Sequence, residues 1–466
     1  MIAAIKEGVL PYAMWILVMG TALLGMAHRA AWPVLLLALL APLPTLWYPT
    51  HELPLGKDTQ DLLVLAALIG VTLQRPGWQR IPHSGCILLM AVFSYASLWI
   101  CSARFSLPPP LSLAHPYLAE WKNFILLLLA YLAAFGALRT EAQVRSLVMI
   151  SLCVLLFVAQ RELQLFVAGE AFSYGRRADG PFWVVGLNAN HFGAYMAHFG
   201  ALALGLALTV RADLHRLFYA AAYLSSLYPL LFSYSRAAYL AALGALTVFG
   251  VIKRRSLLGL VLLIGIVWQT ILPASVVDRI VMTEEEDGVL EASAAARIEV
   301  WEHARTLFFE SPIAGIGFNG FMAARAGESL TDPHNYYLKI AAEQGVIGLV
   351  LLFGLIAAFM HSSWVLHRSG RSVFARGLGA GGLGMLVALL VTNAFGNRFT
   401  PLAIGIPLFL MLGAIERMRV LDAAAAKAGV APEGPAIRSG RPTPSRERRR
   451  RAEDGRWIQG QEGGRT

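Results

Sequence analysis

His334 is a side chain whose setting suits acid–base chemistry. It follows Asp332 and Pro333 at the end of a polar segment, 274 to 333, which separates two apolar stretches. A neutral imidazole can take a proton from a hydroxyl near pH 7, because its ordinary pKa is about 6.5. Lone histidines are more often structural, but His334 leads straight into an apolar stretch, and a group at the end of a helix is held rigidly. We therefore interpret His334 as a general base.

Arginines form the second group of candidates. Arg236 stands between two apolar stretches with almost no loop between them. Such an arginine can simply extend its head group to water at the membrane interface, and that interpretation stays open. A guanidinium also binds phosphate oxygens through two parallel hydrogen bonds, so Arg236 suits the phosphate of a lipid whose tail stays in the bilayer. Arg176 and Arg177, in the segment 169 to 188, can serve the same purpose.

The polar segment also contains an expected helix. Apolar residues recur between charged ones from 294 to 310, which predicts an amphipathic helix lying against the bundle and ending before Pro312. Arg297 is a further anion-binding candidate, because it can turn back toward the bundle from the start of this helix. The glycines from Gly315 to Gly320 match a GxGxxG pattern, but no strand precedes them, so a loop is favoured over a dinucleotide site.

The composition identifies a membrane protein. Hydrophobic residues make up 57% of the 466 residues and charged residues 15%, against about 25% in soluble domains. Thirteen apolar stretches are long enough to cross or enter a bilayer: 11 to 28, 32 to 47, 60 to 74, 84 to 102, 119 to 138, 145 to 168, 189 to 210, 216 to 233, 236 to 252, 256 to 273, 345 to 366, 376 to 395 and 400 to 416. We expect an all-α, polytopic protein with about twelve transmembrane helices, because thirteen would put the N-terminus and Lys6 outside.

Basic residues set the expected topology. Arg and Lys recur in alternate short loops, at 75 to 80, 139 to 145, 211 to 216, 253 to 255 and 368 to 376, which marks these loops as cytoplasmic. The remaining loops face outward. The expected regions are spans in 1 to 273 (about nine or ten, with a smaller outer loop at 169 to 188), a large outer loop at 274 to 344, spans at 345 to 416, and a basic, disordered cytoplasmic tail at 417 to 466.

Several classes of chemistry are disfavoured. Cys86, Cys101 and Cys153 fall in apolar stretches without metal-ligand spacing, and no Walker, HExxH or DxD motif occurs. We expect no metal, no cofactor and no nucleic-acid partner; the net charge of +10 reflects the tail, which is drawn to an anionic bilayer. Without nucleotides outside the cell, a transfer reaction must carry its energy in its donor. A lipid-linked phosphate or pyrophosphate sugar meets that need, with arginines stabilising the leaving group.

These motifs resemble the bacterial O-antigen ligases and their polymerase relatives. The family pattern of a His-Asn pair, nine residues, Gly, two residues and Gly is reproduced by His334, Asn335, Gly345 and Gly348. Three further blocks agree: Ser235-Arg236, then Arg297 and Trp301 with residues 312 to 321, and the asparagine-containing segment 186 to 190. That last segment holds both Asn188 and Asn190, so which of them corresponds to the family's asparagine is open. The resemblance covers about residues 170 to 360.

The resemblance implies transfer of a glycan from undecaprenyl pyrophosphate to a hydroxyl of lipid A-core, with inversion and without metal or nucleotide. It implies that Arg236 and Arg297 bind the pyrophosphate and that His334 is the base. Asn335, Arg177 and Ser235 are supporting residues, and Asn335 orients His334 or the acceptor. The site would face the periplasm from the bacterial inner membrane, with the C-terminus in the cytoplasm.

Three alternatives stay open at this point. A polymerase, or an oligosaccharyltransferase acting on Ser or Thr of proteins, would share the donor site. The polymerase is disfavoured because no arginine in 169 to 188 or 274 to 333 has a glycine at the Arg-x10-Gly spacing typical of polymerases. A transporter needs buried coupling charges and usually an internal repeat, whereas the main charged pair within the spans, Arg161-Glu162, lies near an outer end.

Overall fold

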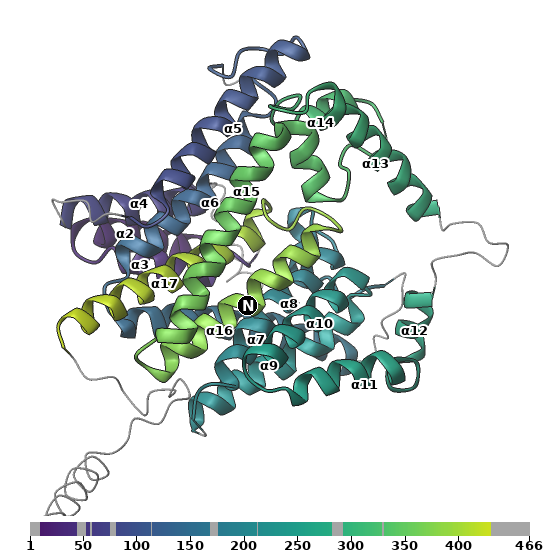
Figure 1. Cartoon of the computed structure of the whole chain (residues 1–466). Coiled ribbons are helices and arrows are strands. Elements are labelled where there is room, and N and C mark those ends of the chain that lie inside the picture. Colours follow the sequence, from purple (N-terminus) through teal and green to yellow (C-terminus); the bar gives the residue numbers. More distant parts are fainter. Residues whose placement is uncertain are drawn as a thin grey trace, which may run out of the picture.

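The computed structural model describes residues 10–43, 53–55, 58–74, 81–112, 114–167, 176–211, 213–281, 292–328 and 330–429. In this part of the chain the regular elements are helices, joined by turns and loops (Figure 1). In chain order they are α2 (Leu10–Ala27), α3 (Ala31–Leu40), α4 (Thr59–Gln74), α5 (Ser84–Arg104), α6 (Leu118–Ala137), α7 (Glu141–Val167), the 3-10 helix η3 (Gly180–Val185), α8 (Ala189–Ala207), α9 (Leu214–Phe232), α10 (Arg236–Ile252), α11 (Ser256–Ile271), α12 (Ala274–Val281), α13 (Ala292–Glu310), α14 (Gly320–Ala324), α15 (Tyr336–Ser369), α16 (Val373–Asn393) and α17 (Leu402–Lys427).

Each of the thirteen predicted apolar stretches lies mainly or wholly in one of these helices. Six helices of the described chain are long and apolar enough to cross a membrane: α2, α5, α6, α7, α15 and α16. The helices α3, α4, α10 and α11 are apolar but shorter. The chain is therefore a polytopic membrane protein, while the expected number of about twelve spans stays a prediction.

The helices pack in two groups, and both α7 and α15 contact helices of each group (Figure 1). One group contains α8, α9, α10 and α16; the other contains α2, α3, α4, α6 and α17. Between α8 and α16 the backbones come close, since a Cβ on Gly205 would lie 2.4 Å from the Cα of Gly381. Small residues permit such contacts where the lipid gives no hydrophobic drive for helix association. Because α15 packs against α16, α17, α5 and α13, its outer end is held from several sides.

The large outer loop is helical, as predicted for its middle part. The helix α13 packs along α15, and its buried face is formed by Val300, Ala304 and Leu307. The expected apolar stripe is therefore wrong in one detail, because Ile298 is exposed. One residue off the buried stripe rotates a side chain by about 100° around the helix, which is enough to face solvent.

Two predicted boundaries differ from the structure. The last helix, α17, continues past residue 416 to Lys427, and an ion pair between Glu416 and Arg419 joins successive turns there. The helix α15 begins at Tyr336, nine residues before the apolar stretch that predicted it. The rest of the predicted tail, residues 430–466, and most of the first half of the segment 169 to 188 lie outside the described residues.

Candidate active site at the outer end of the bundle

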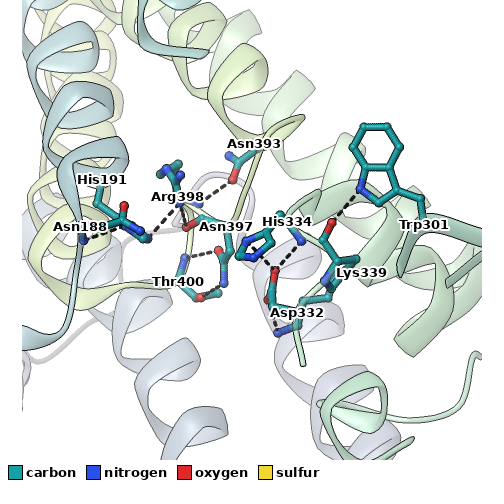
Figure 2. Close-up of polar contacts among 11 residues, drawn as sticks. Asn188, His191, Trp301, Asp332, His334, Lys339, Asn393, Asn397, Arg398 and Thr400 are labelled. Atoms are coloured by element: carbon teal, nitrogen blue, oxygen red, sulfur yellow. Dashed lines mark hydrogen bonds and ion pairs between the residues drawn. The ribbon is translucent and has the colours of Figure 1, made fainter. Parts of the chain in front are cut away.

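His334 lies in a tight turn that is fixed from three directions (Figure 2). The backbone N–H of His334 donates to Asp332 Oδ1 at 2.8 Å, and the indole N–H of Trp301 donates to the carbonyl of Pro333 at 2.7 Å. Asn335 then caps α15, because its Oδ1 accepts from the N–H groups of Tyr337 and Leu338 at 3.1 and 3.2 Å. Asn335 thus determines where the helix begins directly after His334.

This turn holds His334 in an unusual backbone conformation. Its φ of +50° lies in the left-handed region, which costs a residue with a Cβ about 1–2 kcal/mol. Strain of this kind persists only where the surroundings enforce it, and it is found preferentially at functional sites. The imidazole remains accessible, with 44% of the side chain exposed. The left-handed turn therefore presents the ring to the outer face instead of packing it away.

The two glycines of the motif explain how α15 is anchored. At Gly345, φ of +60° and ψ of −157° break the helix, and the loop after Pro312 pairs with the break. The N–H groups of Ile316 and Gly317 donate to the carbonyls of Ala342 and Glu343, and those of Val346 and Ile347 donate to Pro312 and Ile313. The interrupted backbone hydrogen bonds of α15 are thereby replaced.

No side chain fits at this junction. A Cβ on Gly345 would lie 2.4 Å from the carbonyl oxygen of Ile313, and a Cβ on Gly315 would lie 2.2 Å from the carbonyl carbon of Glu343. At Gly348 the added atom would lie 2.3 Å from the Cβ of Gln344. The expectation that the GxGxxG glycines form a loop is confirmed. Their function is to fasten the outer loop to the helix that carries His334.

A second turn at the same end of the bundle carries Arg236. Ser235 caps α10 by accepting from the N–H of Ala238, so Arg236 is the first helical residue. Arg177 reaches this turn, donating from Nε to the carbonyl of Ser233 at 2.7 Å and from Nη2 to Asn190 Oδ1 at 2.7 Å. The structure thus brings Arg177 and Arg236 together, although nearly sixty residues separate them in the chain.

The start of α8 distinguishes the two asparagines of the segment 186 to 190. Asn188, and not Asn190, is the N-cap of this helix, since Asn188 Oδ1 accepts from the N–H of Asn190 at 3.1 Å. The side chain of Asn190 is instead the acceptor for Arg177. A cap must be the last residue outside the helix, and only the geometry shows which of two nearby asparagines has that position.

Electrostatics link His334 to Arg297. Burial lowers the pKa of the His334 imidazole; the carboxylate of Asp332 opposes this, while Arg297, Arg398 and Lys339 lower it further. The net direction is downward, so His334 is neutral at pH 7 and able to accept a proton. Asp332 itself has a lowered pKa overall, because Lys339 Nζ at 3.2 Å and the other nearby donors outweigh its burial.

Comparison with protein families matches residues 220–353 to the model described as O-antigen ligase. The match runs from α9 to the middle of α15 and includes both turns and the junction at Gly345. This segment of the chain is similar to the O-antigen ligase family. A search of curated proteins gives no match. The family supports glycosyl transfer in a membrane, in general terms, as the activity of this domain.

Sequence reasoning missed one arginine beside the O-antigen ligase domain. Arg398 lies in the short loop between α16 and α17, and only 6% of it is exposed. Its Nη1 donates to His191 Nε2 at 2.9 Å and to the carbonyl of Asn397 at 3.0 Å, and its own N–H donates to Asn393 Oδ1 at 2.9 Å (Figure 2). None of these acceptors is charged. Burial lowers the pKa of Arg398 to about 10, which still leaves a cation at pH 7.

The partner of Arg398 fixes the state of His191. A guanidinium can only donate, so Nε2 of His191 must be an acceptor and the ring must carry its proton on Nδ1, which lies 3.0 Å from Asn188 Oδ1. His191 is therefore a neutral support for the arginine. The pKa of Arg398 is also lowered by Arg297 and Arg177, so three guanidinium groups act on one another here.

A signal for Arg398 was present in the sequence. It lies in a very short outer loop, between the apolar stretches 376 to 395 and 400 to 416, where basic residues are normally rare. The same exception singled out Arg236. In the described part of the chain no group of three or more His, Cys, Asp or Glu side chains is placed to hold a metal ion, and the concentrated charge near His334 is positive.

Proposed function

We propose that this protein transfers O-antigen polysaccharide from undecaprenyl pyrophosphate to a sugar hydroxyl of lipid A-core, at the periplasmic face of the bacterial inner membrane. The observation that supports this most is the neutral imidazole of His334 on a rigid turn within the electrostatic reach of Arg297 and Arg398. A base beside a set of cations suits attack by a hydroxyl on a carbon whose leaving group is an anion.

His334 is the general base in this proposal. Its Nδ1 lies 3.9 Å from Asp332 Oδ1, so the carboxylate favours the tautomer with the proton on Nδ1 and leaves Nε2 free to accept one. Nε2 takes the proton of the acceptor hydroxyl as the oxygen bonds to the anomeric carbon. The bond from that carbon to the pyrophosphate oxygen breaks with its electron pair, and attack from the opposite side inverts the configuration.

The arginines bind the leaving group. Arg236 and Arg297 are the pyrophosphate ligands, Arg177 supports them, and Arg398 adds a third guanidinium whose present partners are all neutral. Bidentate contact between guanidinium and phosphate oxygens stabilises the charge that develops as the bond breaks. A buried cation is costly without an anion, so donor binding also relieves a cost in the free protein. No cofactor takes part in these steps.

Deletion of the gene, with comparison of lipopolysaccharide by gel, tests this assignment. We expect loss of the long-chain ladder, an intact core, and accumulation of lipid-linked polymer. Re-expression of the wild type should restore the ladder, and a stably inserted His334→Ala variant should not. A core bearing a single repeat would select the polymerase instead, and an unchanged ladder with lost protein glycosylation would select transfer to protein.

A further inference from the structure

A small cavity opens beside Lys339, at the end of the bundle that carries His334. Its volume is about 180 Å³. Polar side chains line it at Glu120, Asn319, Lys339, Glu343, Asn397 and Thr400, and Met322 lies among them. The cavity is smaller than the roughly 300–1,000 Å³ of typical small-molecule sites, so it holds about one ring of a larger molecule. The exposed Glu120 marks its mouth, and buried residues of α15 form its floor.

Glu343, at the buried end of the cavity, has one carboxylate oxygen that accepts no hydrogen bond within the described chain. Only 1% of the residue is exposed, and its Oε1 has no hydrogen-bond partner within the described chain. The backbone carbonyl of Glu343 accepts from the N–H of Gly317, and its carboxylate also interacts with the backbone of Asn319 and Phe321 at the start of α14, which leaves Oε1 without a partner. A buried acceptor without a partner destabilises the free protein, and a ligand hydroxyl can remove that cost. Lys339, one helical turn earlier, is directed to Asp332 at 3.2 Å.

Asn319 is a second polar residue whose side chain makes no capping hydrogen bond. It occupies the N-cap position of α14, yet its side chain makes no capping hydrogen bond, and its φ is +55°. Asparagine is one of the few residues that tolerates this conformation, but its amide is not used for local structure here. The residue is 7% exposed and lines the cavity. Its amide can both donate to and accept from a hydroxyl group.

We propose that this cavity binds one sugar ring of the acceptor, with Glu343 and Asn319 bonded to its hydroxyl groups. The inference rests on the proposed function and adds the acceptor's binding residues to it. A carboxyl group, an amide and the aromatic rings of Phe318 and Tyr336 suit the hydroxyl edge and the apolar face of a sugar.

The position of the cavity suits this role. It is lined by Lys339 and Asn397, and the carbonyl of Asn397 accepts from Arg398 at 3.0 Å. Asp332 contacts the His334 turn through its Oδ1 and Lys339 through its Oδ2. A ring bound beside Lys339 is therefore connected through Asp332 to the turn that carries the imidazole. In this proposal His334 deprotonates a neighbouring hydroxyl of the same acceptor.

The test is steady-state kinetics of purified protein in liposomes, with undecaprenyl-pyrophosphate glycan as donor and lipid A-core from a deletion strain as acceptor. Glu343→Gln keeps the shape and removes the charge, and we expect its acceptor KM to rise about tenfold or more with the donor KM unchanged. Met322→Trp fills the mouth of the cavity and should raise the acceptor KM similarly. If Glu343→Gln does not fold, Met322→Trp alone tests whether the acceptor binds in the cavity. Glu302→Gln and Phe309→Trp, exposed changes on α13, are the matched controls and should retain wild-type kinetics.

Two results overturn the inference in distinguishable ways. If the wild type transfers glycan and both cavity variants keep its acceptor KM, or change the donor KM instead, the cavity is not the acceptor site and the proposed function stands. If the wild type transfers no glycan to lipid A-core, the proposed function is wrong and the assignment of this cavity is wrong with it.

Discussion

Two turns at the same end of the bundle share one backbone motif but differ in whether the left-handed residue is buried or exposed. Tyr234, Ser235 and the start of α10 parallel His334, Asn335 and the start of α15: a non-glycine residue with φ near +50°, a polar N-cap, then a helix. At the first turn the left-handed residue, Tyr234, is 1% exposed. At the second, 44% of the side chain of His334 is exposed.

The two left-handed residues have different roles, because one is packed in the core and the other is accessible to a substrate. Tyr234 packs inward and donates from its hydroxyl to Ser275 at 2.9 Å, while Arg236, the first residue of the helix, is only partly buried. At the second turn the first helical residue, Tyr336, is packed inside and stacks on Phe399. The same backbone motif thus presents a cation in one case and a base in the other.

The largest effects are expected from replacing the two residues with positive φ, His334 and Tyr234. His334→Ala should lower glycan transfer by about 10²–10⁴-fold without loss of the fold, because a general base is lost from an exposed position. Tyr234→Ala should instead destabilise the protein by about 3–5 kcal/mol, since it empties a buried aromatic site. Transfer assays and thermal unfolding in detergent measure the two outcomes.

His334→Gly is the control for backbone strain. Glycine adopts a positive φ without cost, so this variant should be as inactive as His334→Ala but more stable by about 1 kcal/mol. Normal transfer by either well-folded His334 variant would remove the base assignment. Equal stability of the Ala and Gly variants would show that the turn is not strained.

The next effect is expected at Arg236. Arg236→Lys keeps the charge but cannot make bidentate contact with phosphate, so kcat/KM for the donor should fall about tenfold. Arg254→Lys, beyond the other end of the same helix, is the matched control. Transfer rates at varied donor concentration give kcat/KM for each variant. An unchanged kcat/KM for the donor would mean that the Arg236 side chain only extends to water at the membrane interface and does not bind the donor.

A smaller effect concerns pH. Transfer needs neutral His334, so the rate falls as the pH drops through its pKa, which lies below the ordinary value. Asp332→Asn removes the carboxylate that raises this pKa, so the acidic limb of kcat/KM should move to lower pH. Arg297→Gln removes a cation that lowers it, so the limb should move to higher pH. Profiles between about pH 4.5 and 8 check both signs; shifts in the same direction would contradict the arrangement.

The smallest effects are expected at the two caps. Ser235→Ala and Asn335→Ala each remove a side-chain acceptor for helix N–H groups and should cost about 1 kcal/mol of stability. Asn335→Ala should also reduce transfer severalfold, because the start of α15 sets the position of His334. Thermal unfolding measures the loss of stability, and transfer rates measure the loss of activity. Equal transfer rates for both variants would mean that Asn335 does not position His334.

Much of the fold could be predicted from the sequence. Apolar stretches, amphipathic spacing and Pro312 placed the helices, because burial in lipid or against a neighbour requires continuous hydrophobic runs or one-sided stripes. His334, Arg236 and Arg297 emerged as candidates because polar side chains at such places are costly without a purpose. The boundaries of α15 and α17 did not emerge, since polar turns that continue a helix carry no hydropathy signal.

The sequence by itself determined that this is a helical membrane protein with a long polar segment ending near His334, because these properties depend on composition and local order. Only the tertiary structure showed that the glycines from Gly315 onward fasten that loop to the break at Gly345, and that Asn188 rather than Asn190 is a cap. It also revealed Arg398 and the carboxylate of Glu343. Their surroundings come from helices far apart in the chain, and burial without a charged partner is a property that no local pattern encodes.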